Sequence, residues 1–379
     1  MIPINKPLLG EEEKREVMSV MEENALTSAA ADGGKRVRDL ESLMEGYLGC
    51  KHVIAVNSGT AALHAALLAA GIGPGDEVLV PSFTFVATAN AVVASGAKPV
   101  FVDINTNDYT IDVSDAKRKV TRRTKAVIPV HLYGHPCDMD AVLELAKKRS
   151  LAVIEDACQS LGSTYKKRQT GTFGEMGCFS MYASKVLTAG EGGAIATDNS
   201  RLADKLKMIR NHGMVKGYDT RVLGLNLRLP ELAAAIAKVQ MTKFAAMLAA
   251  RRKNAKLMSE LLRSAKEDIA LPQESDERTF NWYLYTIRFA KGAARNEAMT
   301  RLQKGGIGAT AYYNPPVHRT PYYRKFGARL PATEKCARCV LSLPVHPGVE
   351  EGDIRRAAEL LLSSPSSSSS SSTSISSYS

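Results

Sequence analysis

The feature that most constrains this chain is the alternation of short apolar runs with helical segments between residues 53 and 157. The apolar runs, each typical of a buried strand, are VIAV (53–56), EVLVPS (77–82), KPVFVDI (98–104), KAVIPVHL (125–132) and LAVIEDA (151–157). Continuous apolar strands joined by helices predict an α/β fold with a mostly parallel sheet covered on both faces. Ligands of such sheets bind beyond the carboxyl ends of the strands, so reactive side chains are expected there.

The rest of the chain predicts a second, smaller domain. We expect an N-terminal segment at 1–24 with a helix at 11–23, a large domain at 25–245, and a small α+β domain at 246–362. A long helix at about 230–263 follows Pro230. The final segment, 363–379, is serine-rich and of low complexity, which predicts a disordered tail.

Composition narrows the function classes. The 379 residues are 45% hydrophobic and 23% charged, as in an ordinary soluble globular protein. Lys and Arg (50) exceed Asp and Glu (39) by 11, and these cations are spread along the chain, which favours a small anionic ligand over nucleic acid. Six sparse cysteines, no signal peptide and no apolar run of membrane-spanning length predict a cytoplasmic protein. The CxxC at 336–339 has no second ligand pair, so incidental thiols are expected there and no metal site.

A candidate anion site follows the first strand. In NSGTAALHAAL, a turn of small residues opens directly into a helix, whose N-terminal N–H groups attract phosphate. Ser58 and Thr60 add hydroxyl groups beside Gly59. An ordinary helix cap would have the same appearance, and the Gly-Lys-Ser/Thr ending of a P-loop is absent.

A carboxylate and a lysine follow two later strands. Glu155 and Asp156 end the fifth run, with side chains on opposite faces, and a carboxylate there requires a cation or a hydrogen-bond donor. Asp156 is either a partner for a protonated ligand nitrogen or a helix cap. Lys185, in FSMYASKVLTAGEGG, has apolar neighbours that favour the neutral amine, a nucleophile toward carbonyl groups. Alone, it would more often be an exposed loop lysine.

Together these three elements have one explanation. Pyridoxal phosphate requires a phosphate cradle, an acid partner for its pyridine nitrogen and a lysine for its aldehyde. The chain offers them in the order Ser58–Thr60, Asp156, Lys185, and Phe85, beyond the second strand, could stack on the ring.

These motifs resemble the DegT/DnrJ/EryC1/StrS family of sugar aminotransferases, within the fold-type-I pyridoxal-phosphate enzymes. The resemblance covers about residues 2 to 362. The motifs that carry it are NSGTAALHAAL, GPGDEVLVPSFTFVATANAV, VHLYGHPCDMDAV, VIEDACQSLGSTYKKRQTGTFGEMGCFSMYASKVLTAGEGGAIATD, RNHG and LGLNLRLPELAAAI. It implies a large cofactor domain with a mostly parallel, seven-stranded, aspartate-aminotransferase-like sheet, followed by a smaller α+β domain.

The resemblance also implies residue roles. Lys185 would form the Schiff base with the cofactor and move protons, and Asp156 would keep the pyridine nitrogen protonated. The other implied cofactor contacts are Gln159 at the phenolic oxygen, Ser58, Gly59, Thr60 and Ser180 at the phosphate, Phe85 on the ring, and Asn226, reaching the phosphate across a homodimer. Tyr313 and His318 match the segment that lines the sugar side. Val186 and Tyr312 depart from residues common in the family, Asn and His, and blur the substrate assignment.

The expected reaction is transamination of a nucleotide-linked ketosugar, with L-glutamate as amino donor, to give an aminosugar. Arg210, Arg221 and Arg319 are candidate contacts for the nucleotide diphosphate. Three alternatives stay open: a ketocyclitol aminotransferase using the same residues, a pyridoxal-phosphate sugar dehydratase of the same family, and a regulatory protein without enzymatic activity. Lys185 argues against the dehydratase branch that carries histidine at this position. A nicotinamide-dependent dehydrogenase is disfavoured because no GxGxxG follows the first strand.

Overall fold

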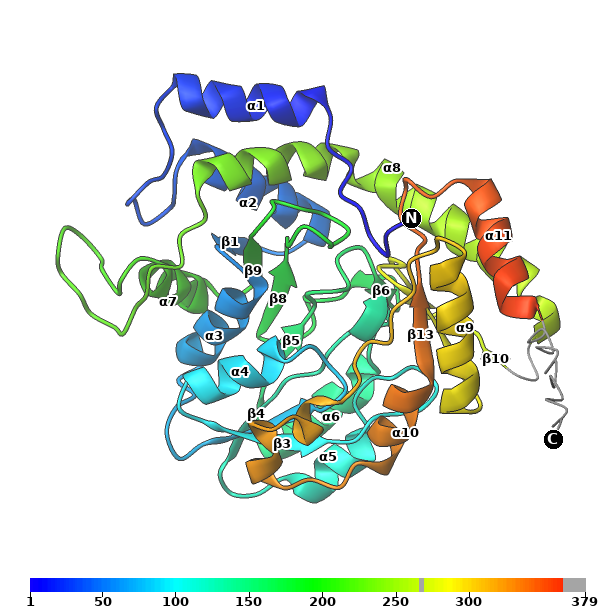
Figure 1. Ribbon diagram of the computed structural model, residues 1–379. Helices are drawn as coiled ribbons and strands as arrows, with labels where there is room; N and C mark the ends of the chain where they lie inside the picture. Colours follow the sequence, from blue (N-terminus) through cyan, green and yellow to red (C-terminus); the bar gives the residue numbers. More distant parts are fainter. Residues whose placement is uncertain (266–268, 364–379) are drawn as a thin grey trace, which may run out of the picture.

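A seven-stranded sheet forms the centre of the computed structural model, which describes residues 1–265 and 269–363 (Figure 1). The strand order is β1-β9-β8-β5-β4-β2-β3. The strands are β1 (His52–Val56), β2 (Glu77–Pro81), β3 (Lys98–Val102), β4 (Thr124–Val127), β5 (Ala152–Asp156), β8 (Met176–Ser180) and β9 (Gly193–Thr197). All neighbouring pairs are parallel except the two that β9 makes, with β1 and with β8. The predicted mostly parallel α/β sheet is therefore confirmed.

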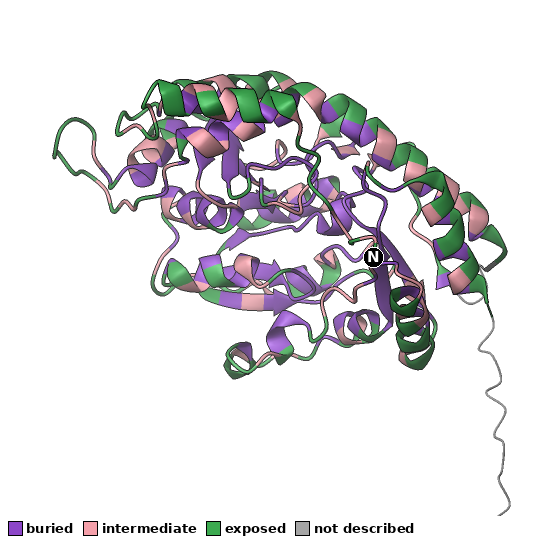
Figure 2. Ribbon diagram, turned by 45° about the horizontal axis from the view of Figure 1, so that its top comes forward, coloured by how far each residue is buried: buried purple, intermediate pink, exposed green. Residues whose placement is uncertain are grey.

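Helices cover both faces of this sheet, and side chains of each strand alternate between two cores. Val53 and Ala55 of β1 face a core that includes α2 (Lys35–Leu48), whereas Ile54 and Val56 face the opposite core. That second core is built from α3 (Gly59–Ala69), α4 (Ala87–Ala94) and α7 (Ser200–Arg210). Near β2 to β5, α5 (Val113–Lys119) and α6 (Met139–Arg149) provide the cover. Figure 2 shows the resulting pattern, with buried strands inside and exposed outer helix faces.

The longest helix, α8 (Glu231–Leu261), spans the molecule (Figure 1). Its first half packs with α2 and under α1 (Glu11–Glu22), and its second half reaches α11 (Glu351–Leu362). Among the described helices, α8 alone has the length and composition of a membrane span. Its packing against three other helices is that of a core helix.

A smaller α+β unit follows α8. Its antiparallel sheet has the order β10 (Ile269–Ala270), β12 (Tyr285–Phe289), β13 (Val340–Leu343), and α9 (Gly292–Lys304), α10 (Pro331–Cys339) and α11 pack around it. A third sheet joins β11 (Arg278–Thr279), β6 (Thr164–Tyr165) and β7 (Arg168–Gln169). This β11–β6 pairing ties the two parts of the chain together beside the carboxyl end of β5.

Of two expectations on the chain's organisation, one strand boundary is corrected and one domain division stays untested. The strand expected at 125–132 ends at Val127, since Pro129 lacks the N–H group that a central strand needs; Val130 makes only an isolated bridge with Asp156. The domain boundary expected at 245/246 falls inside α8, and the division into 1–24, 25–245 and 246–362 stays a prediction. Residues 364–379 of the serine-rich tail lie outside the described residues.

Candidate active site

A cavity of about 390 Å³ lies at the carboxyl ends of the parallel strands. It brings together most of the residues singled out from the sequence: Ser58, Gly59, Thr60, Phe85, Asp156, Gln159, Ser180, Lys185 and Tyr313. These residues follow β1, β2, β5 and β8, with Tyr313 contributed by the smaller unit. The sheet therefore collects at one edge side chains that are up to 255 residues apart in sequence (313 − 58 = 255).

One wall of the cavity is the N-terminus of α3. Ser58 is its N-cap and accepts a hydrogen bond from Ala61 N at 3.0 Å. The N–H groups of Gly59 and Thr60 have no carbonyl partner within the helix because they belong to its first turn. A side chain at position 59 is excluded, since a Cβ atom there would stand 2.8 Å from Ser180 Cβ. The cap and the anion site proposed from the sequence are thus the same feature.

Asp156 faces this cavity from the end of β5 and is only 5% exposed. Thr88 Oγ1 donates to its Oδ2 at 2.8 Å, and Cys158 N donates to its Oδ1 at 3.2 Å. These two donors leave lone pairs on the carboxylate for a further donor in the cavity.

Glu155 lies on the opposite face, as the alternation of a strand requires. It is fully buried and accepts hydrogen bonds from the N–H groups of Gly171, Phe173 and Gly174 at 2.6 to 2.8 Å. His131 Nε2 is 2.9 Å away, and its Nδ1 accepts from Cys137 N, so the ring is neutral and donates from Nε2 to the carboxylate. Glu155 therefore fixes the 171–174 turn and has no place in the cavity.

Lys185 lies in the loop after β8 and is half-buried in the cavity wall. Its Nζ is 3.5 Å from the hydroxyl oxygen of Tyr283 and 4.5 Å from the centroid of that ring. The lysine is thus not the exposed loop residue that its type alone would suggest.

Polar and aromatic groups complete the cavity. Gln159 Nε2 donates to Tyr313 Oη at 3.1 Å, and Gln159 Oε1 accepts from Tyr133 N at 2.9 Å, so both ends of the amide are oriented. Burial raises the pKa of the Tyr313 phenol well above its usual range, so it stays protonated. Phe85 is 54% exposed, at the rim, with its centroid 6.1 Å from that of Tyr313.

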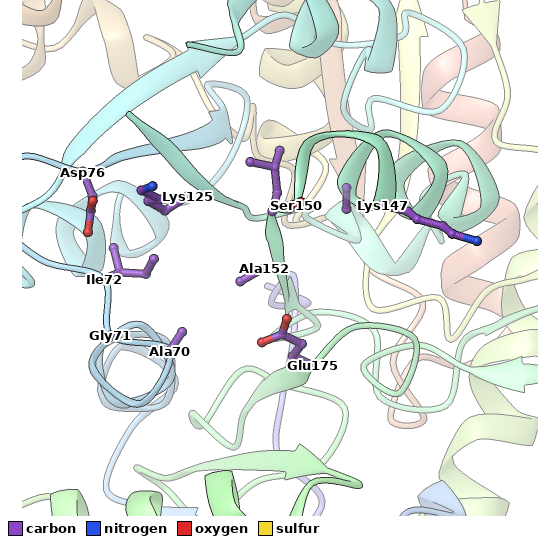
Figure 3. A pocket seen from close by; sticks show the side chains of 11 residues that line it. Ala70, Gly71, Ile72, Asp76, Lys125, Lys147, Ser150, Ala152 and Glu175 are labelled. Carbon is purple, nitrogen blue, oxygen red and sulfur yellow. The ribbon is translucent and has the colours of Figure 1, made fainter. Parts of the chain in front are cut away.

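A larger cavity of about 650 Å³ lies at the other edge of the sheet, near the amino ends of β2, β4 and β5 (Figure 3). It is lined by Ala70, Ile72 and Ala152 together with charged groups such as Asp76 and Glu175, and Lys147 is directed away from the others. None of the sequence-predicted residues lines it. The candidate reactive residues are therefore gathered in the smaller cavity.

Comparison with known proteins identifies the family of this chain. The sequence profile described as the DegT/DnrJ/EryC1/StrS aminotransferase family matches residues 7–362. This chain belongs to that family. It is a pyridoxal-phosphate-dependent aminotransferase of fold type I, as the resemblance implied.

Individual relatives match the sequence of this aminotransferase over most of their length. It is 40% identical to a pleiotropic regulatory protein of Geobacillus stearothermophilus, covering 92% of this chain and 95% of that one. It is 36% identical to GDP-perosamine synthase of Caulobacter vibrioides, covering 95% and 97%. The crystal structure of DesV from S. venezuelae in complex with a ketimine intermediate superposes with a TM-score of 0.88, at 34% identity, covering 95% and 98%.

The cavity of the aminotransferase fits pyridoxal phosphate by the chemistry of its donors. The free N–H groups of α3 and the hydroxyls of Thr60 and Ser180 suit a phosphate. The carboxylate of Asp156, with unused lone pairs, suits a protonated ring nitrogen, and the amine of Lys185 suits an aldehyde.

Two predicted residues lie elsewhere in this chain. Asn226 is exposed, does not line the cavity, and its carbonyl accepts from Asn57 Nδ2 at 3.3 Å. His318 is 3% exposed, with Nδ1 2.7 Å from Ser82 Oγ and Nε2 3.2 Å from Glu334 Oε1. Both ring nitrogens of His318 serve contacts inside the fold, and no contact with the cavity is seen.

The three candidate arginines are also engaged. Arg210 is 2% exposed and forms an ion pair with Glu41 at 2.6 Å, so the expected diphosphate contact is corrected to a core role. Arg221 pairs with Asp219 and Arg319 with Glu334, outside the cavity. Val186 and Leu187, at the break in the family pattern, are buried in the core and do not line the main cavity.

Sequence reasoning missed Thr88, Cys158 and Tyr283, all of which line the cavity. Thr88 lies two turns before the end of α4, and no local signal distinguishes its hydroxyl from a helix-surface threonine. Tyr283 comes 98 residues after Lys185 (283 − 185), and tertiary contacts such as the β11–β6 pairing bring its segment to the cavity. For Cys158, the signal was its place two residues after Asp156, just beyond a strand end.

Proposed function

We propose that this aminotransferase moves an amino group from an amino acid, L-glutamate, to the ketone of a nucleotide-linked sugar and so forms an aminosugar. The observation that carries the proposal is that Lys185 and Asp156 line one cavity with the N-terminus of α3. The 36% sequence identity with a GDP-perosamine synthase, over 95% of the chain, supports a nucleotide-sugar acceptor.

The cofactor would take up the amino group and electrons, and side chains of the protein would move the protons. When bound, pyridoxal phosphate supplies an aldehyde that takes up the amino group and a conjugated ring that takes up electrons from the bond broken at the substrate carbon. Lys185 would hold the cofactor covalently before the reaction. Once displaced by the substrate amine, its Nζ would remove a proton from the amino-bearing carbon. It would then deliver this proton to the carbon that came from the cofactor's aldehyde group.

Asp156 would accept a hydrogen bond from the protonated ring nitrogen. Its fixed negative charge in a cavity wall favours the positive charge on that nitrogen throughout the reaction. Thr88 and Cys158 N hold the carboxylate in place without neutralising it. Gln159 would contact the phenolic oxygen of the ring, and Phe85 would cover the ring from the rim.

Both substrates would use the same cavity in turn. With water supplying the ketone oxygen, the amino acid would depart as a keto acid while its nitrogen is retained in the site. The ketosugar would then bind, and the proton transfers at Lys185 Nζ would reverse. Such an order requires ping-pong kinetics. We assign Tyr313 to the sugar side because its hydroxyl is held by Gln159 at the cavity wall.

We further propose a cytoplasmic homodimer in which Asn226 of the partner subunit contacts the phosphate. In support, Asn226 is exposed and does not line the cavity of its own chain. The neighbouring segment after α7 extends away from the body of the molecule (Figure 1) and exposes Tyr218 and Leu223, which are 97% and 72% accessible. All six cysteines are free thiols, in agreement with a reducing compartment.

A spectrophotometric half-reaction tests the function. The enzyme is converted with L-glutamate to its pyridoxamine form, the excess donor is removed, and candidate ketosugar nucleotides are added one at a time. Return of the initial visible absorbance with a nucleotide ketosugar is the expected result. Return only with a ketocyclitol, or release of product without any need for glutamate, would contradict the proposal in favour of a cyclitol aminotransferase or a dehydratase.

A further inference from the structure

Among the described residues, Tyr283 provides the one side-chain hydrogen bond and the one cation–π contact seen at Lys185 Nζ. The hydroxyl oxygen of Tyr283 is 3.5 Å from this nitrogen, and the ring centroid is 4.5 Å from it. The same hydroxyl is 3.3 Å from Ser184 Oγ, so it can accept from the ammonium group and donate to the serine. The ring face and the hydroxyl oxygen of Tyr283 thus both contact the amine of Lys185.

The position of Tyr283 is set from several sides. Asn281 Oδ1 accepts from Tyr283 N at 2.9 Å, and Asn281 Nδ2 donates to Gln159 O and Leu161 O, both at 2.9 Å. Asn281 therefore locks the segment of Tyr283 to the loop that carries Gln159, in the wall of the same cavity.

Arg251 of α8 holds the other side of this segment. It is 2% exposed, and its Nη1 donates to Trp282 O at 3.2 Å and to Tyr283 O at 3.3 Å. Its Nη2 donates to Asn5 Oδ1 at 3.0 Å. Trp282 has a φ of 54°, in the left-handed region that costs energy for a large side chain, and these hydrogen bonds stabilise it.

We propose that Tyr283 is a positioning residue for Lys185, which keeps the lysine amine directed into the cavity whenever it is not covalently engaged. The inference rests on the proposed function for its purpose, since a displaced lysine must stay in place to move protons and to recapture the cofactor. A cation over a phenol ring is stabilised by the ring's electrons, and the hydroxyl oxygen adds a hydrogen bond. The phenol spans from the smaller unit to the reactive lysine of the large one.

The test measures Lys185 directly, in the full-length chain without added cofactor. Each variant is treated with limiting acetic anhydride at a fixed neutral pH, and mass spectrometry compares acetylation of Lys185 with that of exposed lysines. In Tyr283→Leu, the lysine loses both the hydrogen bond and the ring face over its amine, so the amine is less restrained and more accessible to the reagent. Its relative labelling rate should rise about three- to tenfold. Tyr283→Phe keeps the ring and should raise the rate about twofold.

Tyr285→Phe is the matched control. Tyr285 is fully buried in the smaller unit and its hydroxyl bonds Ser259, remote from the cavity, so labelling of Lys185 should not change. Unchanged labelling in folded Tyr283→Leu overturns the inference. Where that variant fails to fold, unchanged labelling in Tyr283→Phe overturns it.

Cofactor binding by the wild-type chain separates this inference from the proposed function. Visible absorbance on addition of pyridoxal phosphate, together with unchanged labelling in the Tyr283 variants, contradicts the role of Tyr283 alone. Absence of cofactor binding by the wild type contradicts the proposed function, whereas the labelling result still reports on the Tyr283–Lys185 contact. In the active enzyme, Tyr283→Phe should lower kcat with the KM for the amino donor unchanged, because the phenol acts on the lysine and not on the donor.

Discussion

Thr88 donates the hydrogen bond that orients Asp156. The distance from Thr88 Oγ1 to Asp156 Oδ2 is 2.8 Å, and the two residues are 1% and 5% exposed. Thr84 Oγ1 lies 2.9 Å from Thr88 Oγ1 and can donate to it, so a chain of two hydroxyls leads to the carboxylate. These hydrogen bonds fix the orientation in which the carboxylate of Asp156 faces the cavity.

Thr88→Val should weaken cofactor binding about tenfold, because it keeps the shape of the side chain but removes the donor from a buried acceptor. Thr88→Ser retains the hydroxyl and serves as the control, with binding close to that of the wild type. Titration of each protein with pyridoxal phosphate, followed by visible absorbance, gives the dissociation constants. Equal affinities of the valine and serine variants would contradict a role for this hydrogen bond.

Asp156→Asn should reduce kcat on the order of 100- to 1000-fold while the fold is retained, since the amide has the shape of the carboxylate but lacks its charge. Asp156→Glu keeps the charge and should recover part of the rate. Stopped-flow measurement of the glutamate half-reaction reports the chemical step without product release. A rate for the asparagine variant within a fewfold of wild type would contradict the assigned role.

Arg210→Leu should destabilise the chain by about 3–5 kcal/mol, because it leaves Glu41 as a buried carboxylate without its cation. Burial already raises the pKa of Glu41, against the effect of Arg210, and the same carboxylate accepts from Ala55 N of β1 at 2.8 Å. The measurement is the free energy of unfolding in urea. Arg221→Leu removes an exposed arginine and should leave the midpoint unchanged. Equal midpoints for the two variants would contradict the core role of Arg210.

His135 should make the fold sensitive to acid. Its ring is fully enclosed, stacks on Phe280 with centroids 4.2 Å apart, and has no hydrogen-bond partner among the described residues at either nitrogen. Burial lowers the pKa of His135 to about 4, whereas an unfolded histidine titrates near 6.5. Between these values the unfolded chain binds a proton that the folded chain does not. The stability is therefore fully present above about pH 6.5 and falls by about 3 kcal/mol as the pH drops to about 4.

His135→Phe should flatten this dependence, since a phenyl ring has no proton to bind. Urea unfolding of the wild type and the variant between pH 4 and pH 7 provides the comparison. His212→Gln, which changes an exposed histidine, should retain the wild-type slope. A wild-type slope in His135→Phe would mean that other groups cause the loss of stability in acid.

The sequence was sufficient for those parts of the fold and site that depend on local pattern. The apolar runs around Val53, Val78 and Ile154 locate the parallel strands, and residues just past their ends, such as Asp156, line the cavity. This works because a parallel sheet brings the carboxyl ends of its strands to one edge.

Other features depend on tertiary contacts that leave no local trace. Arg210 reads as an ordinary helix arginine, and only the fold reveals that Glu41, 169 residues away, neutralises it in the core. Val186 departs from the family pattern and blurred the substrate assignment, yet it is buried in the core together with the next residue, Leu187. The segment of Tyr283 reaches Lys185 through the anchoring of Asn281 and Arg251, contacts that sequence separation conceals.

Reductive trapping tests the central claim most directly. The enzyme is mixed with pyridoxal phosphate, reduced with borohydride, digested, and analysed by mass spectrometry, with Lys185→Ala as the parallel sample. The account predicts one phosphopyridoxyl group per chain, on Lys185, and loss of both this modification and the visible absorbance in Lys185→Ala. Attachment to a different lysine, or the same visible absorbance and stoichiometric modification in Lys185→Ala, would contradict it.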